Sequence, residues 1–266
     1  MKRNPTKRQT RLAALLSAAP GTIRVDDATN ALGMDRAQAS RQLAAWHRQG
    51  VIRRVAHGVY VPVSPTALGQ TQVLDDPWVL VPELYNPGYV GGWSALEHWE
   101  LTEQVFRSVC VLTTRRVRSG EAIHQGVGFF IKQIPDASLF GTKPLWRGST
   151  KILVSDPHKT MLDVIDDPVI GAGLQHTLDC LREYARRFDS QAARATLLDY
   201  AARIGNGALY KKLGYLAERL GFEKAFINSC RDRITKGYSF LDKNAKDPML
   251  VTRWRLWVPR SIDVHD

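Results

Sequence analysis

Near the N-terminus, one side of a predicted helix carries side chains that suit contact with base edges. At about 100° per residue, small residues alternate on this side with groups that donate hydrogen bonds: Ala37, Gln38, Ser40, Arg41, Ala44 and Arg48. Arginine and glutamine make two-point hydrogen bonds to guanine and adenine edges, and alanine lets a helix lie close to a groove floor. The pattern is typical of a helix in the major groove of DNA. A solvated basic face is the alternative interpretation.

Three short helices and two strands are predicted to hold this side of the helix in place. Apolar residues at helical spacing over residues 12–19 predict a first helix that ends at Pro20-Gly21. We expect a second helix from Asp26 to Gly33. A third helix would run from Asp35 to about Gln49, with Ala39, Leu43 and Trp46 facing inward.

A β-hairpin is predicted directly after these helices. Its strands are Ile52–Val55 and Val59–Val63, and Gly58 supports the tight turn between them. Three helices followed by a hairpin is the order of a winged helix-turn-helix, in which the third helix enters the major groove and the wing contacts the DNA backbone or the minor groove.

The predicted DNA contacts come from three places, the third helix, the wing and the N-terminal segment. Gln38 and Arg41 would contact base edges. On the same helix, Arg36, Ser40 and Arg48 would contact the DNA backbone. The wing would contribute Arg53, Arg54 and His57, and the flexible N-terminal segment would contribute Lys7 and Arg8.

Positive charge is concentrated in the first quarter of the chain. Residues 1–64 carry eleven basic and three acidic side chains, a net charge of +8, against +3 for residues 65–266. Such a surface suits a polyanion, because each neutralised phosphate releases condensed counterions. A solubilising basic segment is the alternative, and the charge alone does not separate the two.

The remaining residues predict a second domain in which strands precede helices. Residues 65–85 are expected to be irregular, residues 85–155 favour strands (105–113, 126–134 and 151–155), and residues 156–235 favour five helices. A final strand is expected near 250–258. Ser64-Pro65-Thr66 marks a boundary between domains 1–64 and 65–266. The predicted fold class is α+β, a winged helix-turn-helix followed by a mixed β-then-α domain.

Several stretches, in order along almost the whole chain, resemble one known family. The two most specific are Gly92-Trp93-Ser94-Ala95-Leu96 and Ser155-Asp156-Pro157-His158-Lys159-Thr160, and the others include His57–Pro62, Lys211–Leu216 and Arg253–Val258. They are similar to the AbiEi antitoxins of type IV toxin–antitoxin operons.

This resemblance implies a function in two parts. The winged helix would bind inverted repeats upstream of its own operon and repress it, with two copies meeting on the DNA. The C-terminal domain would oppose a nucleotidyltransferase-like toxin. An orphan winged-helix regulator, whose C-terminal domain senses a ligand or contacts another protein, is the alternative.

Basic side chains on the predicted C-terminal helices are the candidate surface for such a partner. They are Arg186, Arg187, Lys211, Lys212 and Arg219. A solvated helix face is the alternative interpretation of this group.

Neither a catalytic nor a metal or cofactor site is expected. The chain lacks a GxxxxGK(S/T) loop, a GxSxG elbow and an HExxH pair. Asp156, His158 and Asp163 are interpreted as polar groups at a helix start. Cys110 and the other two cysteines, Cys180 and Cys230, are interpreted as buried free thiols.

Two further expectations concern the tryptophans and the location of the chain. The tryptophans of the second domain are expected to pack in cores or interfaces rather than to stack on bases: Trp93, Trp99, Trp146, Trp254 and Trp257. No apolar run is long enough for a bilayer span or a secretion signal, so we expect a cytoplasmic protein without membrane contact.

Overall fold

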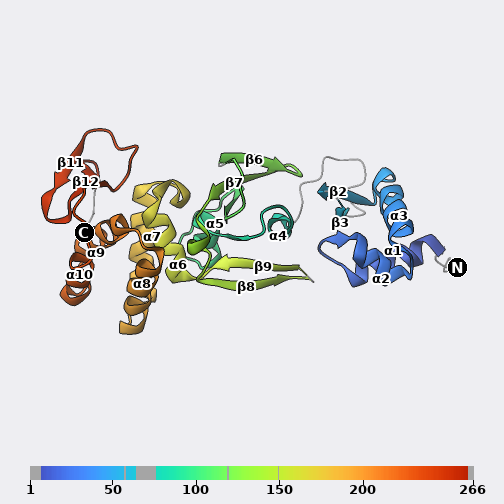
Figure 1. Ribbon diagram of the computed structural model, residues 1–266, viewed down its shortest axis with the longest axis horizontal. Coiled ribbons are helices and arrows are strands. Elements are labelled where there is room, and N and C mark those ends of the chain that lie inside the picture. The colour runs from blue at the N-terminus through green and yellow to red at the C-terminus, as the bar shows by residue number, and fades with distance from the viewer. Residues whose placement is uncertain (1–6, 57, 64–75, 119, 149, 263–266) are drawn as a thin grey trace.

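The structure is a computed structural model that describes residues 7–56, 58–63, 76–118, 120–148 and 150–262. The side chains of Lys7, Arg8 and Ala56 are also outside this description. Figure 1 shows an elongated molecule, with the N-terminal helices at one end, a mixed sheet in the middle, and helices and a small sheet at the other end. The predicted mixture of helices and strands is confirmed.

A winged helix forms the N-terminal end. Its elements are α1 (Lys7–Ala18), β1 (Ile23–Arg24), α2 (Val25–Leu32), α3 (Arg36–Arg48), β2 (Ile52–Ala56) and β3 (Val59–Pro62). Strand β3 pairs antiparallel with both β1 and β2. Leu15, Leu43 and Trp46 belong to the buried core between the helices and this sheet. Helix α2 begins before Asp26, which lies in its first turn instead of at its N-cap.

A six-stranded sheet in the order β6-β7-β5-β4-β9-β8 forms the centre of the second domain. The strands are β4 (Gly88–Val90), β5 (Ser108–Thr113), β6 (Gly120–His124), β7 (Val127–Gln133), β8 (Thr142–Arg147) and β9 (Thr150–Ser155). Antiparallel and parallel pairs alternate across it. The sequence indicated β5, β7 and β9. It did not single out β4, which has only three residues, or the edge strands β6 and β8, which are largely exposed.

The two faces of this sheet are covered by different elements. On one face, Tyr89 and Leu112 join the main core with the helices that follow the sheet. On the other, Val90 and Val111 pack with a 3-10 turn (Pro77–Leu80) and α4 (Val81–Leu84). The expectation of an irregular segment is therefore wrong for residues 77–84. Proline is well tolerated in the first turn of a helix, so Pro77 and Pro82 begin these turns instead of preventing them.

Helices cover the main core and lead to a small sheet. They are α5 (Gly92–His98), α6 (Pro157–Asp166), α7 (Leu174–Arg187), α8 (Gln191–Ile204), α9 (Gly207–Arg219) and α10 (Lys224–Arg231), with a 3-10 turn (Pro168–Gly171) between α6 and α7. Side chains of Asp156, Ser190 and Asn206 accept hydrogen bonds from the first turns of α6, α8 and α9, as N-caps do.

The C-terminal segment forms three strands where the sequence predicted one. These are β10 (Ser239–Phe240), β11 (Pro248–Val251) and β12 (Leu256–Pro259), in the order β10-β12-β11. The single strand expected near 250–258 is wrong, because a 3-10 turn (Thr252–Trp254) divides it into β11 and β12. Trp254 is fully buried in this turn and packs against Gly214 of α9.

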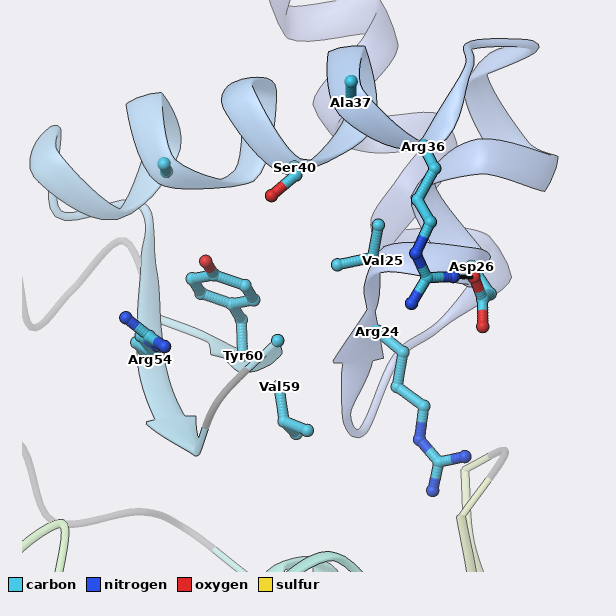
Figure 2. A pocket seen from close by; sticks show the side chains of 11 residues that line it. Arg24, Val25, Asp26, Arg36, Ala37, Ser40, Arg54, Val59 and Tyr60 are labelled. Carbon is cyan, nitrogen blue, oxygen red and sulfur yellow. Dashed lines mark hydrogen bonds and ion pairs between the residues drawn. The ribbon is translucent and has the colours of Figure 1, made fainter.

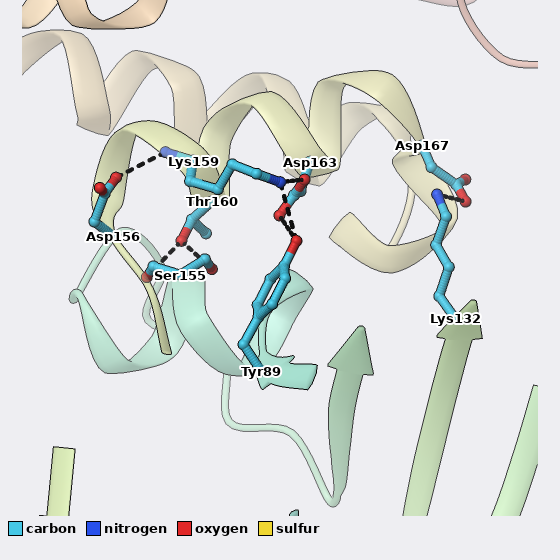
Figure 3. Close-up of polar contacts among 8 residues, drawn as sticks. All are labelled: Tyr89, Lys132, Ser155, Asp156, Lys159, Thr160, Asp163 and Asp167. Carbon is cyan, nitrogen blue, oxygen red and sulfur yellow. Dashed lines mark hydrogen bonds and ion pairs between the residues drawn. The ribbon is translucent and has the colours of Figure 1, made fainter. Parts of the chain in front are cut away.

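A buried polar cluster joins the central sheet to α6 (Figure 3). Lys159 is fully buried, forms an ion pair with Asp163, and donates a hydrogen bond to the Tyr89 hydroxyl at 3.0 Å. The Tyr89 hydroxyl in turn donates to Asp163 Oδ2 at 2.8 Å. Burial raises the pKa of both Tyr89 and Asp163. Asp163 thus balances a buried charge, and Asp156 caps α6 by accepting from Lys159 N at 2.9 Å.

This cluster predicts that a change of Lys159 alone is more damaging than the loss of both charges. Lys159→Met leaves the Asp163 carboxylate buried without its cation, so we expect the free energy of unfolding to fall by about 3–5 kcal/mol. Denaturant unfolding measures this loss. In the double variant Lys159→Met/Asp163→Leu no charge is left uncompensated, and most of the stability should return. A single variant as stable as the wild type would contradict the assignment.

Candidate nucleic-acid interface

Helix α3 separates a buried and an exposed side as predicted. Ala39, Leu43 and Trp46 are buried, whereas Arg41 and Arg48 are exposed. This amphipathic arrangement places the arginines on the side of α3 that faces away from the domain core, where a second macromolecule can reach them.

The start of α3 is fixed by a reciprocal capping arrangement. Asp35 Oδ1 accepts a hydrogen bond from Gln38 N at 2.8 Å, and Gln38 Oε1 accepts one from Asp35 N at 3.3 Å. Gln38 is exposed, but its amide oxygen takes part in the cap. A two-point contact between Gln38 and adenine uses this same oxygen, so it requires the long hydrogen bond to Asp35 N to open.

A groove of about 780 Å³ lies between α3 and the β2–β3 hairpin. Figure 2 shows the guanidinium groups of Arg24, Arg36 and Arg54 on its sides, and Ser40 pointing from α3 toward the hairpin and Tyr60. The small side chains of Ala37 and Ala44 also line it, on the same helix. The groove therefore brings together three cations from separate elements beside the exposed side of α3.

The arginines of this region differ in their partners. Arg36 forms an ion pair with Asp26, and Arg24 forms one with Glu83 at 2.6 Å. The hydrogen bond from Arg24 to Glu83 raises the pKa of Arg24. Within the described part of the chain, Arg41 and Arg48 have no ion-pair partner. They are available to a polyanion without breaking an internal contact.

The two faces of the β2–β3 hairpin point in different directions. Arg54 pairs across the hairpin with Tyr60, and both line the groove. Arg53 pairs with Val61 on the other face, and its guanidinium donates to Gln125 Oε1 at 3.2 Å. Gln125 Nε2 donates to the Arg54 carbonyl at 3.2 Å. The structure thus directs Arg53 toward the second domain, whereas it was expected to contact DNA from the wing.

The structure describes the other residues predicted to contact DNA only in part. The His57 side chain and those of Lys7 and Arg8 lie outside the described residues, although the backbone of Lys7 and Arg8 forms the first turn of α1 instead of a flexible segment. Reasoning from the sequence missed Arg24. Its position depends on the pairing of β1 with β3, where Arg24 lies opposite Val59. Only this tertiary pairing brings Arg24 to the groove.

The prediction that Lys211 and Lys212 face a partner is wrong. Both lie on α9 and are buried. The Lys211 ammonium donates to the Gly237 carbonyl, and that of Lys212 donates to the Asp166 carbonyl at 2.6 Å. Burial lowers the pKa of both lysines. Long apolar stems allow lysine to bury most of its side chain when its ammonium reaches an acceptor.

The arginines of the same group are exposed. Arg186 pairs with Glu183 on its own helix at 2.7 Å, and Arg187 donates to the Trp99 carbonyl at 2.6 Å. Arg219 is also exposed at the end of α9. With two of its five members buried, the group does not form one continuous basic surface.

The cysteines are free and buried, as predicted. Burial raises the pKa of Cys180 and of Cys230 to about 12, which disfavours their thiolates. Among the described residues, no group of three or more His, Cys, Asp or Glu side chains is arranged to hold a metal ion. The described helices include none that is both long and apolar enough to cross a membrane.

The winged-helix segment resembles a known family. Residues 11–63 match the family model described as "Transcriptional regulator, AbiEi antitoxin". In this segment the chain resembles the AbiEi regulators. The match includes α2, α3 and the hairpin, so it confirms the resemblance for the elements that build the groove. No curated protein matches the chain.

The cap of α3 generates a prediction about the stability of this AbiEi-like segment. Asp35→Ala removes the acceptor for Gln38 N, and we expect the free energy of unfolding to fall by about 0.5–2 kcal/mol. Thermal or denaturant unfolding measures the change. Asp35→Asn keeps a side-chain oxygen at the same place and serves as the control, with little loss expected. Equal losses for the two variants would argue against the cap.

Proposed function

We propose that this protein is an antitoxin and transcriptional autorepressor that binds operator DNA through its winged helix. One observation carries the proposal: the exposed side of α3, with Arg41 and Arg48 free of ion pairs among the described residues, lies beside an arginine-lined groove within the segment that matches the AbiEi regulators. The local charge of +8 over residues 1–64 supports a polyanionic partner.

The docking follows from the arrangement of α3 and the hairpin. Helix α3 enters the major groove, where Arg41 contacts a guanine edge and Ala37 and Ala44 allow close approach. Ser40 and Arg48 hold the sugar-phosphate backbone. Arg36 exchanges Asp26 for a phosphate, a small loss because both side chains are largely exposed, at 73% and 69%.

The hairpin and the N-terminus complete the contact. Arg54 holds a phosphate from the wing, whereas Arg24, which also lines the groove, stays paired with Glu83. His57, Lys7 and Arg8 remain in the proposed interface. Arg53 is assigned to the domain contact with Gln125 instead. Inverted repeats present two equivalent half-sites, so two copies bind together on the operator.

The second activity is neutralisation of a nucleotidyltransferase-like toxin by the domain that follows residue 64. The two most specific AbiEi-like stretches in this domain are buried. Residues 92–96 belong to α5 and are buried, and Lys159 of α6 belongs to the buried polar cluster. These stretches therefore determine the fold, and the surface that acts on the toxin lies elsewhere on the domain.

The docking predicts different effects for two arginines of α3. Arg41→Ala should weaken binding to the duplex upstream of the gene by about 1–3 kcal/mol and relax base preference at one position. Arg48→Ala should weaken binding to every sequence and reduce the slope of log K against log salt by about 0.9. Fluorescence anisotropy over a salt series measures both. Arg186→Ala, an equal charge loss at an exposed position of α7, is the matched control and should change neither quantity. If Arg41→Ala and Arg48→Ala leave operator affinity unchanged, the docking is wrong.

The two activities should separate in a growth assay. Induction of the adjacent reading frame should stop growth, and co-expression of this protein should restore it. The double variant Arg41→Ala/Arg48→Ala should still restore growth while losing repression of a reporter gene, because both residues belong to α3, which lies at the N-terminal end of the molecule (Figure 1). A neighbour that is harmless, or toxic but not rescued, would leave a regulator without antitoxin activity.

A further inference from the structure

Apolar side chains form a partly exposed row on the small C-terminal sheet. Phe240 of β10 lies beside Trp257 of β12, and Leu250 of β11 lies beside Trp257 on its other side. Paired residues on neighbouring strands point to the same face of a sheet. We call the row Phe240-Trp257-Leu250 the outer face. Phe240 is 43% exposed, and Tyr238, immediately before β10, is 61% exposed.

The geometry of the two rings suits stacking. The ring centroids of Phe240 and Trp257 are 6.2 Å apart, and their planes differ by only 19°. The opposite face of the sheet already supplies the packing that the fold requires, because Leu256 and Val258 of β12 are fully buried there. The aromatic surface of the outer face is therefore left for a ligand.

Buried contacts beneath the sheet fix the position of this face. Lys211 donates to the Gly237 carbonyl and to Ser239 Oγ, immediately before Phe240. Trp254 Nε1 donates to Glu218 of α9 at 2.6 Å. A surface held in place before binding loses less conformational entropy when a ligand arrives.

The chain around this sheet is the second concentration of positive charge in the protein. Residues 224–262 carry nine basic and three acidic side chains, a net charge of +6, whereas residues 65–223 carry 17 basic and 18 acidic ones. Lys236, Lys243 and Lys246 flank β10 and are exposed, and none has an ion-pair partner among the described residues. Charge and aromatic surface thus coincide at one end of the molecule.

A hollow of about 570 Å³ adjoins the outer face. Tyr238, Phe240 and Lys243 are among the residues that line it. Two of its three acidic side chains are engaged by other side chains, since Asp167 pairs with Lys132 at 2.6 Å and Asp166 accepts from Asn206 at 2.7 Å. The third, Asp242, accepts a hydrogen bond from Asn244 N at 2.8 Å. The hollow offers space for a base beside Tyr238 and Phe240, and Lys243 lines the same hollow.

We propose that the outer face binds single-stranded nucleic acid. Unpaired bases stack on Phe240, Trp257 and Tyr238, and Lys236, Lys243 and Lys246 hold the phosphates. Bases in a duplex cover one another and cannot stack on side chains in this way, which selects a single strand. A protein partner would be the natural occupant of an apolar face without charge, but the net charge of +6 favours a polyanion. The site lies at the opposite end of the molecule from the winged helix, so it does not depend on operator binding (Figure 1).

The test measures binding of the full chain to fluorescein-labelled oligouridylate and oligothymidylate of about twelve nucleotides, within the usual site size. Phe240→Leu and Trp257→Leu keep apolar bulk and remove the stacking ring, so each should weaken binding about five- to a hundredfold. The double variant Lys243→Gln/Lys246→Gln should weaken it further at low salt and reduce the slope of log K against log salt by about 0.7 per lysine.

Two matched controls locate the site. Trp146→Leu removes another exposed tryptophan, 61% accessible on β8, and should leave oligonucleotide affinity unchanged. Arg41→Ala should weaken the operator duplex and leave the single strand unaffected, which distinguishes this site from the winged helix.

Three results would overturn the proposal. One is binding that survives both Phe240→Leu and Trp257→Leu. Another is binding that is lost with Arg41→Ala, which would place it on α3. The third is absence of binding to both oligonucleotides; if Phe240→Leu then also abolishes rescue from the toxin, the outer face belongs to a protein partner.

Discussion

Both faces of the β2–β3 hairpin are covered, one by the N-terminal helices and the other by the cluster of the central sheet. The placement of the winged helix relative to the second domain depends on these two contacts. Successive side chains of a strand point to opposite faces, so Tyr60 packs with the helices while Val61 packs with the cluster of the central sheet. A shift of register by one residue would exchange these faces and expose both sets. Arg24 with Glu83, and Arg53 with Gln125, add polar contacts to the same junction. The orientation of α3 relative to the second domain follows from this alternation.

Positive charge in this protein is of two kinds. Lys159, Lys211 and Lys212 contribute to the net charge of +11, but their ammonium groups are used within the fold. Arg41 and Arg48 at one end, and Lys243 and Lys246 at the other, are exposed. An ammonium that donates to a buried carbonyl or carboxylate cannot also reach a phosphate, so net charge overstates the surface available to a polyanion.

Between these two basic ends, residues 65–223 carry nearly equal numbers of basic and acidic side chains. The core of the second domain combines one face of the central sheet with α6 to α9, and the cluster of Lys159, Asp163 and Tyr89 fixes α6 on that sheet. The C-terminal sheet is attached to α9 through Trp254, which packs where Gly214 leaves space for its ring. An added Cβ on Gly214 would lie 2.3 Å from that ring, so the close approach depends on glycine.

Local patterns in the sequence determined the winged helix. The apolar spacing of α1 and α3, the Asp35 cap and the alternation of β2 and β3 are all encoded within a few residues, and each element formed as expected. The strongly buried strands β5, β7 and β9 were also indicated, because their β-branched and aromatic residues are dense.

Only the tertiary structure decided which charged and aromatic side chains are accessible. Helical periodicity placed Lys211 and Lys212 on α9, but their burial depends on the segment of Gly237 and on Asp166, 26 and 46 residues distant. Arg24 reaches the groove through the pairing of β1 with β3, and Phe240 meets Trp257 through a parallel pair that no short pattern encodes. Accessibility is a property of what packs against a residue, and contacts between distant segments have no signature in the local sequence.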